Sequence, residues 1–80
     1  MINKKIMKKL FPIQKTLYFY IENSTDFPIT IKKISQELGV SRQSVSAGIQ
    51  LLLEYDLIDV IEYKTHKEIF KKGYLFDDEI

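Results

Sequence analysis

Apolar residues recur at helical spacing along three stretches of the chain, and short polar segments separate these stretches. The clearest pattern lies within residues 30–58, where the apolar positions are three or four apart in each half: Ile34 and Leu38, then Val45, Ile49 and Leu52. This spacing predicts two short helices that pack against each other, one over Ile31–Leu38 and one from after Ser41 to about Tyr55.

The ends of these two helices have their own sequence signals. Gly39 follows the last apolar residue of the first helix, where a left-handed conformation is needed that glycine adopts at low cost. Thr30 and Ser41 precede the helices, where a hydroxyl accepts from the free N–H groups of the first turn. The polar residues after Ser41 lie largely off the apolar stripe, so we expect an exposed face: Arg42, Gln43, Ser44, Ser46, Ala47 and Gln50.

Two further patterns precede this pair. Residues 1–11 combine four lysines with apolar residues at helical spacing and predict a basic N-terminal arm or short helix. Ile13–Ile21 predicts a helix with a wide apolar face, to which Phe11, Tyr18 and Phe19 add. Such a helix is either buried on two sides or forms a subunit contact. Glu22–Pro28 is rich in turn-forming residues and predicts a loop. Ile29, directly after this loop, can form a short β-pairing with the hairpin expected later in the chain.

The C-terminal part alternates between apolar and polar residues and predicts a hairpin, a wing over residues 57–76. Leu57–Tyr63 forms one strand and a return strand begins at Glu68. The tip is either Thr65-His66 or Lys72-Gly73. With the first tip, Lys64 and Lys67 would face each other across the hairpin, an unfavourable pair that a phosphate would neutralise. Tyr74-Leu75-Phe76 is expected to fold back on the core or a partner, and residues 77–80 form an acidic tail.

Composition limits the possible functions. The chain has 80 residues, 45% of them hydrophobic and 29% charged, and it has no cysteine. We expect one small domain over residues 1–80, without disulfides or thiolate metal sites. No apolar run approaches the ~20 residues that span a bilayer. The net charge of +1 divides unevenly, because residues 1–45 hold eight basic and three acidic residues and residues 46–80 hold four and eight.

The segment ISQELGVSRQSVSAGIQLLLEYDLI resembles the helix-turn-helix of the winged-helix transcription regulators, as in the MarR and GntR families. The matching positions are Ser35, Leu38-Gly39-Val40-Ser41-Arg42, Val45-Ser46, Ile49, Leu52 and Leu57-Ile58. Gly48 and Tyr55-Asp56 depart from that pattern, and Gly48 is expected to allow a close approach by another group. The resemblance implies a mainly α fold with a small β-hairpin, a winged helix-turn-helix of three to four helices and a two- or three-stranded wing.

The exposed helix face has the chemistry that reads base pairs. A helix fits the major groove of B-DNA, where Arg42 can grip guanine and Gln43 or Gln50 can pair with adenine. Ser44 and Ser46 can reach bases or phosphates, and Ala47 can touch a thymine methyl group.

Other residues are expected to contact the DNA backbone. Thr30 and Ser41 begin helices whose N-termini attract phosphates. Lys32 and Lys33 can orient the protein on the duplex without specifying sequence. We also assign the wing tip to this interface: Lys64, Thr65, His66 and Lys67.

The sequence therefore predicts a cytoplasmic, sequence-specific double-stranded DNA-binding protein, a homodimeric transcription regulator or repressor of a kind found in viruses and plasmids. The alternatives are a winged-helix interaction adaptor and a replication or recombination accessory. An enzyme is not expected, because the only histidine, His66, lies in a hairpin tip and the three glycines are far apart. We expect no cofactor, metal or membrane partner, and we predict no small-molecule effector.

Overall fold

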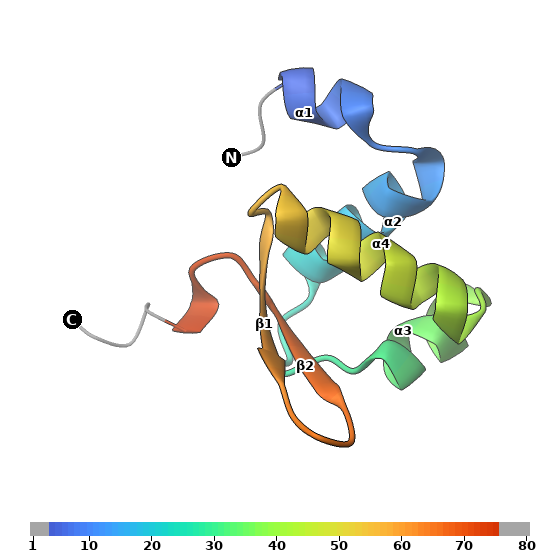
Figure 1. The fold of residues 1–80 in the computed structure, drawn as a ribbon, viewed down its shortest axis with the longest axis vertical. Helices are drawn as coiled ribbons and strands as arrows, with labels where there is room; N and C mark the ends of the chain where they lie inside the picture. Colours follow the sequence, from blue (N-terminus) through green and yellow to red (C-terminus); the bar gives the residue numbers. More distant parts are fainter. Residues whose placement is uncertain (1–3, 76–80) are drawn as a thin grey trace.

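A computed structural model describes residues 4–75. Within that range the chain forms four helices and one two-stranded antiparallel sheet (Figure 1). In chain order the elements are α1 (Lys4–Lys9), α2 (Pro12–Asn23), α3 (Ile31–Leu38), α4 (Arg42–Glu54), β1 (Ile58–Glu62) and β2 (Lys67–Lys71). The fold is a winged helix-turn-helix, as expected from the sequence.

Both helices of the helix-turn-helix begin and end where the sequence signals lie. Gly39 ends α3 with φ 67° and ψ 30°, and its N–H donates to the carbonyl of Ser35. The Ser35 hydroxyl in turn donates to the Val40 carbonyl at 2.5 Å. This small side chain therefore joins the end of α3 to the turn, which fixes the angle at which α4 leaves.

The core lies where α2, α4 and the hairpin meet. Its fully buried side chains come from every element except α1: Leu17, Ile21, Ile29, Ile34, Val45, Ile49, Leu52, Ile58 and Ile69. α2 approaches α4 closely at Gly48, because a Cβ built there would lie 2.3 Å from Leu17 Cδ1. The close approach expected at Gly48 is confirmed, and the group that approaches is Leu17.

The hairpin settles the choice of tip. β1 and β2 pair from Ile58↔Lys71 to Glu62↔Lys67, so the connecting loop is residues 63–66. The turn is therefore the one expected near Thr65-His66, with Lys64-Thr65 at its centre because the Tyr63 N–H donates to the His66 carbonyl, while Lys72-Gly73 forms a separate turn after β2. The predicted opposition of Lys64 and Lys67 is wrong, because the four-residue loop sets Glu62 opposite Lys67 and leaves Lys64 outside the paired strands.

A third backbone segment joins the sheet at one position. Ile29 pairs with Ile69, and each residue's N–H donates to the other's carbonyl at 2.9 Å. The loop before α3 is thereby tied to the return strand of the hairpin. The pairing expected for Ile29 is confirmed, and it amounts to a single bridge.

Two carboxylates hold the turn after β2. Asp59 Oδ2 accepts from the Gly73 N–H at 3.0 Å, and the Lys72 ammonium lies 2.5 Å from Asp56 Oδ1 and 3.4 Å from Asp59 Oδ1. Asp56 itself has φ 60°, a left-handed conformation that is uncommon for residues other than glycine. The short polar side chain of aspartate tolerates this conformation better than most residues do.

Tyr74 folds back as expected. Its ring centroid lies 4.7 Å from that of Phe27 and 5.8 Å from that of Phe70, so three aromatic rings cover this side of the sheet. Phe76 and the acidic tail of residues 77–80 fall outside the described residues.

The N-terminal helices differ in part from expectation. α1 is a short basic helix whose Ile6 and Met7 pack against the core, with residues 1–3 outside the described range. α2 buries one face, including Leu17 and Ile21. Phe11 and Phe19, counted with that apolar face, are 67% and 50% exposed instead. α2 is therefore not buried on two sides.

Candidate nucleic-acid interface

The outer face of α4 carries the polar residues expected there. Val45, Gly48, Ile49 and Leu52 face the core, whereas Arg42, Gln43, Ser44, Ala47 and Gln50 are exposed and Ser46 is half-buried. The helix-turn-helix geometry thus separates the two faces cleanly. α4 presents Arg42 and Gln43 in its first turn, with Gln50 two turns later.

The hydroxyls before α3 and α4 cap these helices. Thr30 Oγ1 accepts from the Lys33 N–H at 3.1 Å, and Ser41 Oγ accepts from the Ser44 N–H at 3.2 Å. The Ser41 hydroxyl also donates to Ser44 Oγ at 3.0 Å. Each hydroxyl is already engaged by its own helix, so the role of Thr30 and Ser41 in fixing the helix starts is plain.

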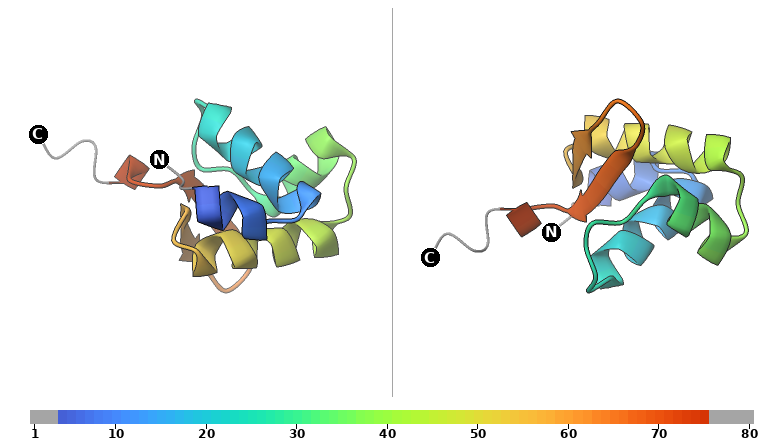
Figure 2. Two further views of the ribbon diagram at one scale, coloured as in Figure 1. Left: turned by 90° about the horizontal axis from the view of Figure 1, so that it is seen from above. Right: turned by 90° about the horizontal axis from the view of Figure 1, so that it is seen from below.

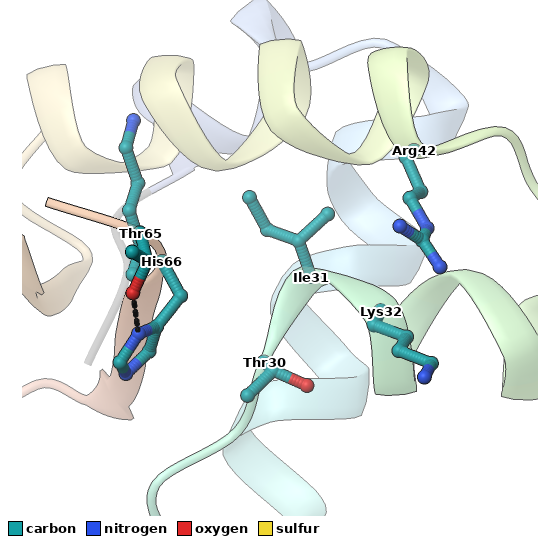
Figure 3. Close-up of a pocket in the computed structure, with 7 residues that line it drawn as sticks. Thr30, Ile31, Lys32, Arg42, Thr65 and His66 are labelled. Carbon is teal, nitrogen blue, oxygen red and sulfur yellow. Dashed lines mark hydrogen bonds between the residues drawn. The ribbon is translucent and has the colours of Figure 1, made fainter. Parts of the chain in front are cut away.

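A hollow of about 410 Å³ lies between the start of α3, the start of α4 and the hairpin loop. Its lining comes from three separate parts of the chain: Thr30, Ile31, Lys32, Arg42, Thr65, His66 and Lys67. Figure 3 shows Ile31 in the middle, with Arg42 and Lys32 on one side and Thr65 and His66 on the other. All of these except Ile31 are residues that the sequence assigned to DNA.

The lining of the hollow is basic. Lys32 and Arg42 form no ion pair among residues 4–75. Lys67 is partly neutralised by Glu62, whose Oε1 lies 3.8 Å from the Lys67 ammonium. None of the described residues that line the hollow is acidic. Such a surface attracts an anion, and a chain of phosphates is attracted at several points.

Two of the predicted backbone contacts lie elsewhere. Lys64 is exposed in the hairpin loop but does not line the hollow. Lys33 lies beside a second, smaller hollow of about 190 Å³, which also includes Tyr20 and Glu37. There the Tyr20 hydroxyl donates to the Glu37 carboxylate. Burial and this hydrogen bond raise the pKa of Tyr20 from 10.0 to about 12.

Sequence reasoning missed Ile31, Tyr63 and Glu68. Ile31 is half-buried, and only the approach of the hairpin places it inside the hollow. Tyr63 begins the hairpin loop and Glu68 lies in β2 just after it, and both contact His66, a juxtaposition that depends on the strand register. A tyrosine and a glutamate five positions apart give no signal of contact until that register is known.

The described residues contain no cluster of three or more His, Cys, Asp or Glu side chains able to hold a metal ion. None of the helices found between residues 4 and 75 has both the length and the apolar character needed to span a bilayer.

A helix-turn-helix with a β-hairpin beside its second helix defines the winged helix-turn-helix class of proteins. A family model described as an HTH domain matches residues 13–74, so the chain belongs to the HTH (helix-turn-helix) domain family. This membership supports DNA binding, and domains of this family are typically not enzymes. No curated protein and no solved structure gives a significant match.

Proposed function

We propose that this protein binds double-stranded DNA sequence-specifically, with α4 in the major groove and the hairpin against the backbone. The observation that carries the proposal is the position of Arg42. It begins the exposed polar face of α4 and also lines the basic hollow. Arg42 thus belongs both to a helix that fits the major groove and to a basic surface that can bind phosphates.

The residues of α4 divide by the reach of their side chains. Arg42 reads guanine and Gln43 or Gln50 reads adenine, each good bidentate contact discriminating by about 1–3 kcal/mol. Ser44, Ser46 and Ala47 are short enough to let the helix approach the base edges. Among the exposed residues of α4, we expect Arg42 and Gln43 to contribute most to sequence preference.

The hollow takes the backbone of one DNA strand. Lys32 and Arg42 attract phosphate from the helical side, and Lys67 and His66 do so from the hairpin. Ile31 supplies apolar contact to the sugars between them. Lys33 and Lys64, outside the hollow, contact neighbouring phosphates, and Thr30 and Ser41 present capped helix N-termini to the same backbone.

We further propose a cytoplasmic homodimer that regulates transcription, in the manner of the MarR and GntR regulators it resembles. A two-fold pair reads two half-sites about one helical turn apart, which gives a small domain enough specificity. Phe11 and Phe19 are exposed on or next to α2 and do not line the hollow, and Figure 2 shows the hairpin loop on the α4 side of the molecule rather than beside α2. A dimer through these residues leaves the basic hollow open.

Titration with salt tests the binding proposal. Affinity for random duplex should fall linearly on a log–log plot, with a slope near −0.9 for each phosphate contacted. Lys32→Ala should lower the magnitude of that slope by about 1 and affect all sequences alike. A protein that binds no duplex at low salt would instead be an interaction adaptor.

Selected sequences test specificity. After enrichment from a random duplex pool, Arg42→Ala and Gln43→Ala should remove the preference for the selected site while the melting temperature stays unchanged. Gln36→Ala, an exposed glutamine on α3, is the matched control and should keep the preference. Equal loss in all three variants would contradict the role of α4.

Light scattering tests the dimer. The wild type should have the mass of two chains at micromolar concentration, and Phe19→Asp should have the mass of one. Thr16→Asp, at an exposed position of the same helix, is the control for the added charge. A monomeric wild type would contradict the dimer without affecting the test of DNA binding.

A further inference from the structure

Three side chains form a unit at the end of the hairpin. The rings of Tyr63 and His66 are nearly parallel, with centroids 4.8 Å apart and an interplanar angle of 12°. The Tyr63 hydroxyl donates to Glu68 Oε1 at 3.1 Å, and His66 Nε2 lies 3.7 Å from Glu68 Oε2. One carboxylate thus contacts both members of the stacked pair.

The second nitrogen of His66 is also engaged. Its Nδ1 lies 3.1 Å from Thr65 Oγ1, and the His66 carbonyl accepts from the Tyr63 N–H at 2.8 Å. The His66 side chain is 47% exposed, yet its ring stacks on Tyr63, its Nδ1 lies within hydrogen-bond distance of Thr65, and its Nε2 lies beside the Glu68 carboxylate. An exposed side chain in a loop usually keeps its rotamer freedom, and losing it on binding costs free energy.

The negative charge of Glu68 is unexpected beside a surface that is proposed to bind DNA. A carboxylate beside a basic, phosphate-binding surface opposes binding of the polyanion. Its contacts nevertheless point to the rim residue His66 and to the ring stacked on it. We propose that Glu68, with Tyr63, is a positioning residue that holds His66 at the edge of the hollow for contact with the DNA backbone. This inference rests on the proposed DNA-binding function.

Glu62 provides a matched comparison on the same hairpin. It ends β1, its side chain is 65% exposed, and it pairs with Lys67 at 3.8 Å rather than with the aromatic rings. Loss of its carboxylate removes one negative charge and frees Lys67. If charge alone mattered, Glu62→Ala and Glu68→Ala would both strengthen DNA binding.

The test compares the dissociation constants of these variants for one duplex at fixed salt. Glu62→Ala should bind more tightly than the wild type. Glu68→Ala and Tyr63→Phe should bind roughly two- to tenfold more weakly, the effect of one net hydrogen bond. In a His66→Ala background, Tyr63→Phe should have no effect on affinity. Tighter binding by Glu68→Ala than by the wild type, or an undiminished effect of Tyr63→Phe without His66, would overturn the proposal.

A measurement without DNA separates this inference from the proposed function. The chain has one histidine, so its ring gives a single set of NMR signals. Glu68→Ala should shift these signals toward those of a free histidine, because the ring leaves the Tyr63 face, whereas Glu62→Ala should leave them in place. If the wild type binds no duplex, the proposed function fails. Unchanged His66 signals in Glu68→Ala would separately refute the positioning role.

Discussion

The helix-turn-helix and the hairpin are stabilised by contacts of different range along the chain. In the helix-turn-helix, Thr30, Gly39 and Ser41 act on groups within four residues of themselves. In the hairpin, Asp59 reaches Gly73, and Ile69 reaches Ile29, forty residues earlier in the sequence. The first region is specified locally, whereas the second depends on the rest of the fold.

This difference bears on how the two regions serve recognition. The caps fix where α3 and α4 begin and end, and packing of their apolar faces on the core holds them in place, which suits the element that reads bases. The hairpin combines its own strand pairing and two fully buried side chains, Ile58 and Ile69, with contacts to distant segments such as Gly73 and Ile29. We therefore expect changes at the helix pair to alter global stability, and changes at the hairpin outside its buried residues to have smaller and more local effects.

The largest effect is expected at Gly48. Gly48→Ala forces a Cβ against the buried Leu17, and overpacking of this kind costs about 1–3 kcal/mol. The better helix propensity of alanine returns at most about 1 kcal/mol, so chemical denaturation should show a lower free energy of unfolding. Ala47→Gly, at the exposed neighbouring position, measures the propensity term alone.

A second substitution tests the cause. Leu17→Val removes the δ-carbon nearest to the added methyl group and leaves an ordinary contact at the γ-carbon, 3.8 Å away. In that background Gly48→Ala should be neutral or stabilising. A loss as large as in the wild type would mean that Gly48 is required for another reason.

The next effect is expected at the cap of α4. Ser41→Ala removes the acceptor for the Ser44 N–H and should lower the free energy of unfolding by about 1 kcal/mol. Ser46→Ala, on the same helix but not at a cap, serves as the control and should stay within about 0.5 kcal/mol of the wild type. Equal effects of the two variants on thermal unfolding would argue against the local specification of this helix.

A smaller effect is expected in the hairpin. Asp59→Ala removes the acceptor for the Gly73 N–H, a hydrogen bond of ordinary net worth, about 0.5–1.5 kcal/mol. Hydrogen exchange at Gly73 should accelerate, while exchange in α3 and α4 should change little. Uniform acceleration through the helices would show that the hairpin is not the more independent region.

The smallest effect is expected from alkaline pH at the contact between α2 and α3. Because folding raises the pKa of Tyr20 from 10.0 to about 12, its stabilisation is complete below pH 10 and is lost as the pH rises toward 12. Tyr20→Phe should lose less stability over this window. Some loss should remain, since burial also raises the pKa of Tyr18. Parallel pH profiles for wild type and variant would contradict the assignment.

The sequence predicted best what is decided locally. The bounds of α3 and the residue before α4 were predictable because a cap or a left-handed glycine needs only its own neighbours. Gly48 suggested a close approach, but Leu17 could not be named, since the crossing of α2 over α4 depends on the whole core. Phe11 and Phe19 were assigned to an apolar face because spacing along a helix does not show where its partners end.

The candidate site shows the same division. Most of its lining residues were predictable as types, since short polar and basic side chains suit DNA. Their arrangement around one hollow was not, because it depends on how closely the hairpin approaches the start of α3. The error over Lys64 and Lys67 has the same origin, since loop length sets the register and the sequence allowed more than one loop.

The single bridge between Ile29 and Ile69 links the hairpin to the segment that leads into α3. Any swing of the hairpin away from α3 has to break two reciprocal peptide hydrogen bonds, both belonging to residues with almost no exposed surface. These two amides should therefore exchange with solvent at one shared rate. That exchange rate would measure how often the hairpin moves away from the start of α3 and opens the hollow, and it can be measured before any ligand is known.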